Sequence, residues 1–213
     1  MAKNKTLVTF DGEGTVTAIP DQVTVSLTVE AKTDTSLQRA VSKQAEQKKS
    51  LYELLKQLGV ENKNVSSSNY QSAPETEYDN GKHKKTGFFV ATESVVVKVP
   101  VALANKVVGQ SSKWAEVSGI QVGLSRELAN VKREEALELA ITAAEAKAAK
   151  RATRLGLTLG KIVGFNEGRS SNSSPKMYRM ASLGGAESVD SNAELNEGES
   201  EVSATVTLTY KLK

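Results

Sequence analysis

The chain has 213 residues, a formal net charge of +3 and no cysteine. The lack of cysteine excludes disulfides, thiol nucleophiles and zinc–thiolate sites, and it fits an oxidising compartment. The charge is small and spread along the chain, which argues against a nucleic-acid partner, and no apolar run approaches the roughly 20 residues of a transmembrane segment.

The N-terminal part of the sequence predicts one short strand, a turn and one long strand. An apolar run at residues 7–10 leads into Asp11-Gly12-Glu13-Gly14, which predicts a turn. A structural turn or bulge is favoured there over a phosphate loop, because the third glycine of a dinucleotide-binding motif is missing and no helical pattern follows. After Pro20-Asp21, apolar and polar residues alternate over residues 23–30, which predicts a strand with one wet face.

A long helix is predicted next, over residues 37–58. Thr35 or Ser36 can cap its start, and Gly59 can end it. The expected buried stripe consists of Leu37, Val41, Ala45, Tyr52, Leu55 and Leu58.

Residues 65–78 and 86–99 predict a hairpin around Asp79-Asn80-Gly81, because Asn-Gly favours tight turns. Its tip, residues 82–85, is basic and holds the single histidine, His83, so a catalytic triad or a multi-histidine metal site is excluded by count. The tip could contact an acidic surface, but a solvated hairpin end is favoured.

Pro100 suits the first turn of a shorter helix that reaches about Glu116. Trp114, near its end, is interpreted as a core anchor rather than a ligand platform. Alternation over residues 120–125 predicts a further strand.

The strongest helical pattern runs from Asn130, a candidate N-cap, to Gly156, a candidate terminator. Its many alanines favour helix formation and would let a sheet approach closely. The expected buried stripe consists of Leu137, Ile141, Ala144, Ala148, Ala152 and Leu155.

The C-terminal part predicts two strands, at residues 162–167 and 202–212, around a Ser/Asn/Gly-rich tract at residues 169–199. A loop of that length is either functional or disordered. Its apolar island supplies the candidate oligomer or partner contacts, Met177, Tyr178 and Met180. An unstructured loop is the equally weighted alternative.

The order of elements predicts an α+β fold of two βαββ units, with long helices packed on largely antiparallel sheets. We expect one domain over residues 1–213. Its first unit would span residues 7–99, a linking helix residues 100–118, and its second unit residues 119–213.

Several stretches, taken in order, resemble the SIMPL-domain family. They include Gly12-x-Gly14 before Pro20-Asp21, the alternating strand that follows, and Leu58-Gly59-Val60 before Asn64-Val65. The remaining matches are Tyr78 with Asn80-Gly81, Glu135-Ala136-Leu137 with Ala144, Ala148 and Ala152, Leu155-Gly156, Leu159-Gly160, Gly198-Glu199, Val202-x-Ala204-x-Val206 and Tyr210. The resemblance covers nearly the whole chain.

The family's bacterial members include periplasmic immunogenic proteins and an envelope protein linked to oxidative-stress defence. The resemblance therefore implies an α+β fold, a periplasmic or secreted location, and higher oligomers, ring-like or channel-like in some members. Because eukaryotic members act inside cells as signalling adaptors, a cytoplasmic location is the alternative. No export signal is visible at the start of this sequence. The family offers no catalytic residues to transfer.

The leading functional hypothesis is a non-enzymatic, self-associating envelope protein without a cofactor. The alternative is a protein-binding adaptor that uses a sheet edge or the tract at residues 169–199. An enzyme is the least favoured class. A Ser–Lys pair that uses Lys161 is not excluded by counting, and Glu134-Glu135 are interpreted as complementing a helix dipole rather than as an acid–base pair.

Overall fold

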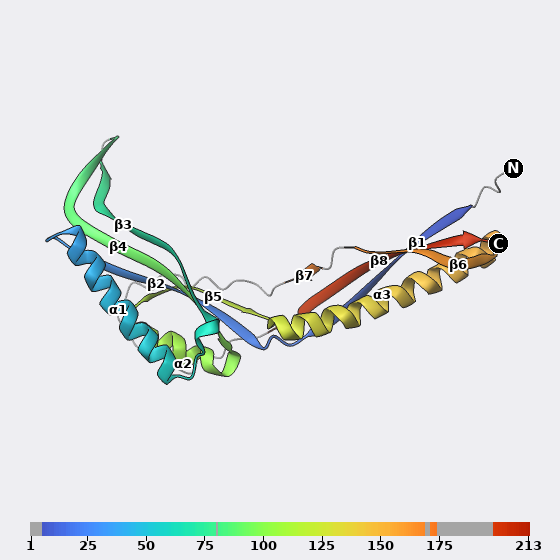
Figure 1. Cartoon of the computed structure of the whole chain (residues 1–213), viewed down its shortest axis with the longest axis horizontal. Helices are drawn as coiled ribbons and strands as arrows, with labels where there is room; N and C mark the ends of the chain where they lie inside the picture. Colours follow the sequence, from blue (N-terminus) through green and yellow to red (C-terminus); the bar gives the residue numbers. More distant parts are fainter. Residues whose placement is uncertain (1–5, 80, 169–170, 174–197) are drawn as a thin grey trace. The chain divides into compact units, whose positions relative to one another are not determined.

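The computed structural model describes residues 6–79, 81–168, 171–173 and 198–213 (Figure 1). They form two compact units, each with an antiparallel sheet and at least one helix packed on it. The α3 unit comprises the described residues 6–21, 123–168, 171–173 and 198–213, and the α1 unit comprises residues 22–79 and 81–122. The expected α+β class, with long helices on antiparallel sheets, is confirmed.

The sheet of the α3 unit is centred on β8 (Ser200–Leu212). β1 (Leu7–Ala18) pairs with β8 antiparallel along nearly its whole length. On the other side, β8 pairs with β6 (Leu159–Glu167) and β7 (Ser171–Ser173). α3 (Arg126–Leu155) packs on β1 and β8 (Figure 1).

The surface of α3 that faces the sheet is a row of alanines, each four residues from the next. All five are buried: Ala136, Ala140, Ala144, Ala148 and Ala152. The expected stripe is therefore partly wrong, because Leu137 and Ile141 lie half-buried beside this row and Leu155 is exposed. The small alanines let the helix backbone approach the strands, and the larger side chains stand at its flanks.

Gly12 and Gly14 lie within β1, directly beneath α3. A Cβ atom at Gly12 would lie 2.0 Å from the carbonyl oxygen of Ala140, and one at Gly14 would lie 2.1 Å from the carbonyl oxygen of Ala136. The turn or bulge expected at residues 11–14 is therefore wrong, because β1 pairs with β8 through these residues without a shift in register. These glycines allow close contact between a strand and a helix backbone, and the chain does not reverse there.

α3 begins earlier than expected, because Ser125 and not Asn130 is its N-cap. The Ser125 Oγ accepts a hydrogen bond from the Leu128 N–H at 3.2 Å and donates one to Asp21 Oδ2 at 2.6 Å. Gly156 ends the helix in the left-handed conformation, with φ of 64°, as the sequence predicted.

The α1 unit has a four-stranded sheet in the order β3-β4-β2-β5. Its strands are β2 (Gln22–Thr33), β3 (Val65–Asp79), β4 (Lys82–Pro100) and β5 (Glu116–Gly123). α1 (Leu37–Gln57) and α2 (Val101–Ser111) pack on this sheet, and a short 3-10 helix (Asn62–Asn64) precedes β3. The predicted hairpin is confirmed as β3 and β4, which pair antiparallel.

Alternate residues of β2 and β4 form the core of the α1 unit with the helices. The buried strand residues are Val23, Val25, Leu27, Val29, Ala31, Ala91, Val95, Val97 and Val99. From the helices, Leu51 and Leu55 of α1 and Ala104 and Val107 of α2 complete the core. Trp114, which was expected to anchor the core, is 38% exposed beyond the end of α2.

α1 begins after Ser36, whose Oγ accepts a hydrogen bond from the Arg39 N–H at 3.2 Å, and Gly59 follows the helix with φ of 80°, as predicted. Its expected stripe is only partly right. Leu55 is buried, but Leu37, Val41, Tyr52 and Leu58 are half-buried, and Ala40 and Leu51 are buried instead of their neighbours Val41 and Tyr52. Ala45 is exposed, and Gln44 is buried in its place. Gln44 can be buried here because its side chain donates a hydrogen bond to Glu93 of β4.

The strand pairing divides the chain differently from the expected units at residues 7–99 and 119–213. β1 pairs with β8 and lies in the α3 unit, and β5 belongs to the sheet of the α1 unit. The order β2-α1-β3-β4 does give a βαββ arrangement in the α1 unit. No local pattern indicates that strands from opposite ends of the chain pair with each other.

Candidate functional site

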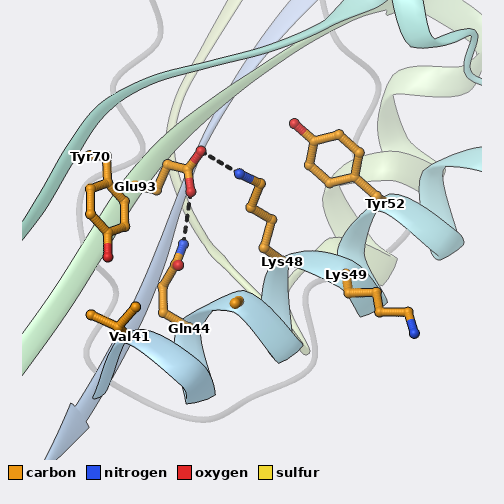
Figure 2. Close-up of a pocket in the computed structure, with 8 residues that line it drawn as sticks. Val41, Gln44, Lys48, Lys49, Tyr52, Tyr70 and Glu93 are labelled. Carbon is orange, nitrogen blue, oxygen red and sulfur yellow. Dashed lines mark hydrogen bonds and ion pairs between the residues drawn. The ribbon is translucent and has the colours of Figure 1, made fainter. Parts of the chain in front are cut away.

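A pocket of about 460 Å³ opens between α1, β3 and β4, within the α1 unit (Figure 2). Its volume lies in the range of roughly 300–1,000 Å³ that is typical of small-molecule sites. The lining residues are Val41, Gln44, Ala45, Lys48, Lys49, Tyr52, Tyr70 and Glu93.

Glu93 lies on the face of β4 that α1 covers. On this face its neighbours along β4 are Ala91 and Val95, both fully buried, and it stands opposite Val29 of β2. The Glu93 side chain is only 7% exposed. The alternation along β4 would place an apolar residue here, and a buried carboxylate is unfavourable unless it is paired.

Gln44 and Lys48, one turn apart on α1, pair with this carboxylate. Lys48 Nζ lies 2.7 Å from Glu93 Oε1, and Gln44 Nε2 donates to Glu93 Oε2 at 3.1 Å (Figure 2). Burial by itself would raise the pKa of Glu93. Hydrogen bonds from Lys48, Ser67 and Gln44 outweigh burial, so this pKa lies below its ordinary value of 4.5. Glu93 therefore stays ionised and holds the Lys48 ammonium in place.

A β-bulge brings Tyr70 to the pocket. Asn69 and Tyr70 of β3 together stand opposite the single residue Glu93 of β4. The extra residue reverses the side-chain alternation of β3, so that Tyr70 lines the pocket below α1. Asn69 has φ of 54°, a left-handed conformation that is uncommon outside glycine and that asparagine adopts more readily than most residues.

The remaining lining side chains give the pocket an aromatic and partly apolar character. The Tyr52 ring lies 5.9 Å from Lys48 Nζ, a cation–π distance. Val41 and Tyr70 lie on the side of Glu93 that is away from Tyr52 (Figure 2). The arrangement offers an oriented ammonium between two phenol rings, which suits the binding of a ligand.

The structure separates the residues that the sequence analysis singled out. Glu135 forms an exposed ion pair with Lys132 at 2.8 Å, and Lys161 is exposed on β6. The exposed His83 packs edge-on against the Tyr78 ring at the hairpin tip. The candidate contact residues Met177, Tyr178 and Met180 lie outside the described residues.

The sequence does not single out the pocket residues as a site, although two of them leave a signal. Glu93 interrupts an apolar alternation between Ala91 and Val95, and Gln44 follows Ala40 by one helical turn on the buried face of α1. Either polar residue at a core position could have indicated a buried pair. Tyr70 left no such signal, because the bulge that reorients it is set by pairing with β4.

Within the described residues, no group of three or more histidine, cysteine, aspartate or glutamate side chains could hold a metal ion. No helix in the described part of the chain is both long and apolar enough to cross a membrane.

The chain is similar to a known protein family and to a curated protein. Residues 8–210 match the family model SIMPL, described as a protein of unknown function (DUF541). The chain is 29% identical over 160 residues to the uncharacterized protein YggE of Edwardsiella ictaluri (strain 93-146), a match that covers 73% of this chain. The match spans 65% of the relative's length. Because the family model covers nearly the whole sequence, this chain belongs to the SIMPL family.

Proposed function

We propose that this chain is a non-enzymatic, self-associating protein of the cell envelope, periplasmic or secreted, with a role in stress defence. The observation that supports self-association is an exposed apolar cluster on β6. Its members are Ile162, Val163 and Phe165, which are 46%, 54% and 51% exposed.

This cluster lies beyond the area that α3 covers. Ile162 stands opposite Tyr210 and Phe165 opposite Leu208, and both of these β8 residues are buried. In the described part of the chain β6 pairs with β8 alone and forms an edge of the sheet. Apolar side chains beside an unpaired strand edge favour association with another chain, and full burial of each would contribute about 1.5–3 kcal/mol.

Sedimentation velocity at micromolar concentration tests this proposal. We expect the unmodified chain to sediment as an oligomer, and the double variant Ile162→Glu/Phe165→Glu to sediment as a smaller species. Val131→Glu is the matched control, because Val131 is 55% exposed on α3 in the same unit. An unmodified chain that is strictly monomeric, or a control that dissociates equally, would contradict self-association.

The envelope location is supported by the cysteine-free sequence, since such a chain cannot form wrong disulfides in an oxidising compartment. Release of the native protein from cells by osmotic shock, followed by N-terminal sequencing, tests this part. Recovery with the cytoplasmic fraction would contradict it.

The adaptor alternative is favoured by β5, an eight-residue edge strand beside β2 in the α1 unit. Such an edge can accept an extended peptide as an added strand. Purification from the native cells would distinguish the two functions. Self-association predicts copies of the chain, whereas an adaptor predicts one foreign protein at fixed stoichiometry.

A further inference from the structure

We propose that the pocket between α1, β3 and β4 binds a small aromatic carboxylate, with its carboxylate on Lys48 and its ring against Tyr70 or Tyr52. This site is independent of the proposed self-association, which uses β6 in the other unit.

The charges of the lining favour an anion over a cation. Glu93 contributes one negative charge, and Lys48 and Lys49 contribute two positive charges. Both oxygens of Glu93 are already engaged, one by Lys48 Nζ and one by Gln44 Nε2. A cationic ligand would have to share these oxygens with the donors already in place, and it would be repelled by the two lysine charges of the lining. An ammonium has three N–H donors, and Lys48 Nζ directs one of them at Glu93, so it retains donors for a second carboxylate.

The pocket also holds Lys48 in a defined position before a ligand arrives. The Lys48 side chain is 33% exposed, and its Nζ is held 2.7 Å from Glu93 and lies beside the Tyr52 ring. An ion pair of this kind reduces the rotamer entropy that a free surface lysine would lose on binding. The mouth of the pocket therefore presents a fixed positive group that is still accessible to solvent.

The walls select for a flat ring. A bulge brings Tyr70 to the pocket, where its side chain is half-exposed. Asn69, in the same bulge, has a left-handed backbone conformation. Bulges and strained backbone conformations concentrate at binding sites, where they direct a particular side chain. Tyr70 and Tyr52 lie on opposite sides of Glu93 (Figure 2), so a ring can stack on one phenol while its carboxylate reaches Lys48.

The test compares 2-naphthoate with its neutral amide, 2-naphthamide, by titration of the full-length ¹⁵N-labelled chain followed by NMR. We expect 2-naphthoate to shift the amide signals of α1 and β3 around the pocket, and to bind about ten-fold more tightly than the amide, because a charge-assisted hydrogen bond is lost in the amide.

Variants assign the interaction to its residues. Lys48→Met is expected to weaken 2-naphthoate binding about ten-fold, and Tyr70→Ala several-fold. Lys43→Met is the matched control, because Lys43 is exposed on α1, does not line the pocket, and changes the net charge equally. Because Lys48→Met removes the ion-pair partner of Glu93, the unfolding of this variant is followed in parallel, and Tyr70→Ala tests the site with the ion pair intact.

Three results would overturn the proposal. The first is an amide that binds as tightly as the acid, and the second is a Lys43→Met variant that loses as much affinity as Lys48→Met. The third is an unmodified chain whose pocket signals do not move at millimolar 2-naphthoate.

Discussion

The two long helices contact their sheets in different ways. Beneath α3, alanines meet Gly12 and Gly14, and a single added Cβ would collide with the helix backbone. Beneath α1, the corresponding row includes Gln44, which meets Glu93 across the interface, and a pocket opens beside them. One interface is sealed by small apolar residues, and the other holds a polar cluster within its core.

The difference shows how side-chain size and polarity determine whether a helix–sheet interface can bind a ligand. Glycine and alanine bring the two backbones so close that an added Cβ at Gly12 or Gly14 would meet the backbone of α3, and packing is then sensitive to added atoms. Beneath α1, longer polar side chains line a pocket, and the buried charge of Glu93 needs partners. The candidate site therefore lies at the interface of α1 with its sheet, where a pocket is present.

The largest expected effect comes from adding volume to the sealed interface. Gly12→Val should destabilise the α3 unit by about 3 kcal/mol or more, because the new side chain meets backbone atoms of α3 that cannot move independently. Hydrogen exchange measured by mass spectrometry should show lost protection in α3 and β8 and retained protection in α1 and β4.

Glu13→Val is the matched control for this prediction, since Glu13 is the next residue of β1 and is exposed on the opposite face. It should change the unfolding free energy by less than about 0.5 kcal/mol. Equal tolerance of both substitutions would mean that the α3 interface is not close-packed.

The second-largest expected effect tests whether Gln44, Lys48 and Glu93 stabilise the α1 unit jointly. Glu93→Val alone should cost about 1–3 kcal/mol, because Gln44 and Lys48 lose their shared partner. Gln44→Leu alone should cost about 1 kcal/mol. In the double variant Gln44→Leu/Glu93→Val the cost should be smaller than the sum, because an apolar pair then resembles the α3 interface. Urea unfolding of the unmodified chain, the two single variants and the double variant measures the coupling free energy between Gln44 and Glu93. Strictly additive losses of unfolding free energy would contradict a joint role.

The smallest effect is a pH dependence confined to the α1 unit. The folded-state pKa of Glu93 lies below 4.5, so its ionised form favours the folded state. This contribution is complete above pH 4.5 and is lost as the pH falls through the folded-state pKa. The stability difference between the unmodified chain and Glu93→Gln should therefore shrink on acidification.

Glu53→Gln provides the control, because Glu53 is exposed on the same helix. Urea unfolding at several pH values between about 7 and 3 compares the variants. A stability difference for Glu93→Gln that is constant over this range would contradict the role assigned to its carboxylate.

The local elements of this fold were largely predictable. Ser36 and Gly59 delimit α1, Gly156 ends α3, and the hairpin at Gly81 joins β3 to β4. Each of these depends on residues that are neighbours in the sequence, so capping and turn preferences suffice. The candidate site was less predictable, because Gln44, Tyr70 and Glu93 come from three elements and meet through strand pairing.

By itself, the sequence determined the helices, most of the strands and the family to which the chain belongs, because periodicity, caps and ordered motifs are local properties. Tertiary structure alone decided that β1 pairs with β8, that Gly12 and Gly14 face α3, and that a bulge turns Tyr70 toward Glu93. These outcomes depend on which distant segments share a surface. A glycine or a buried glutamate has the same local preferences in many contexts, and its role is set by the atoms that pack against it.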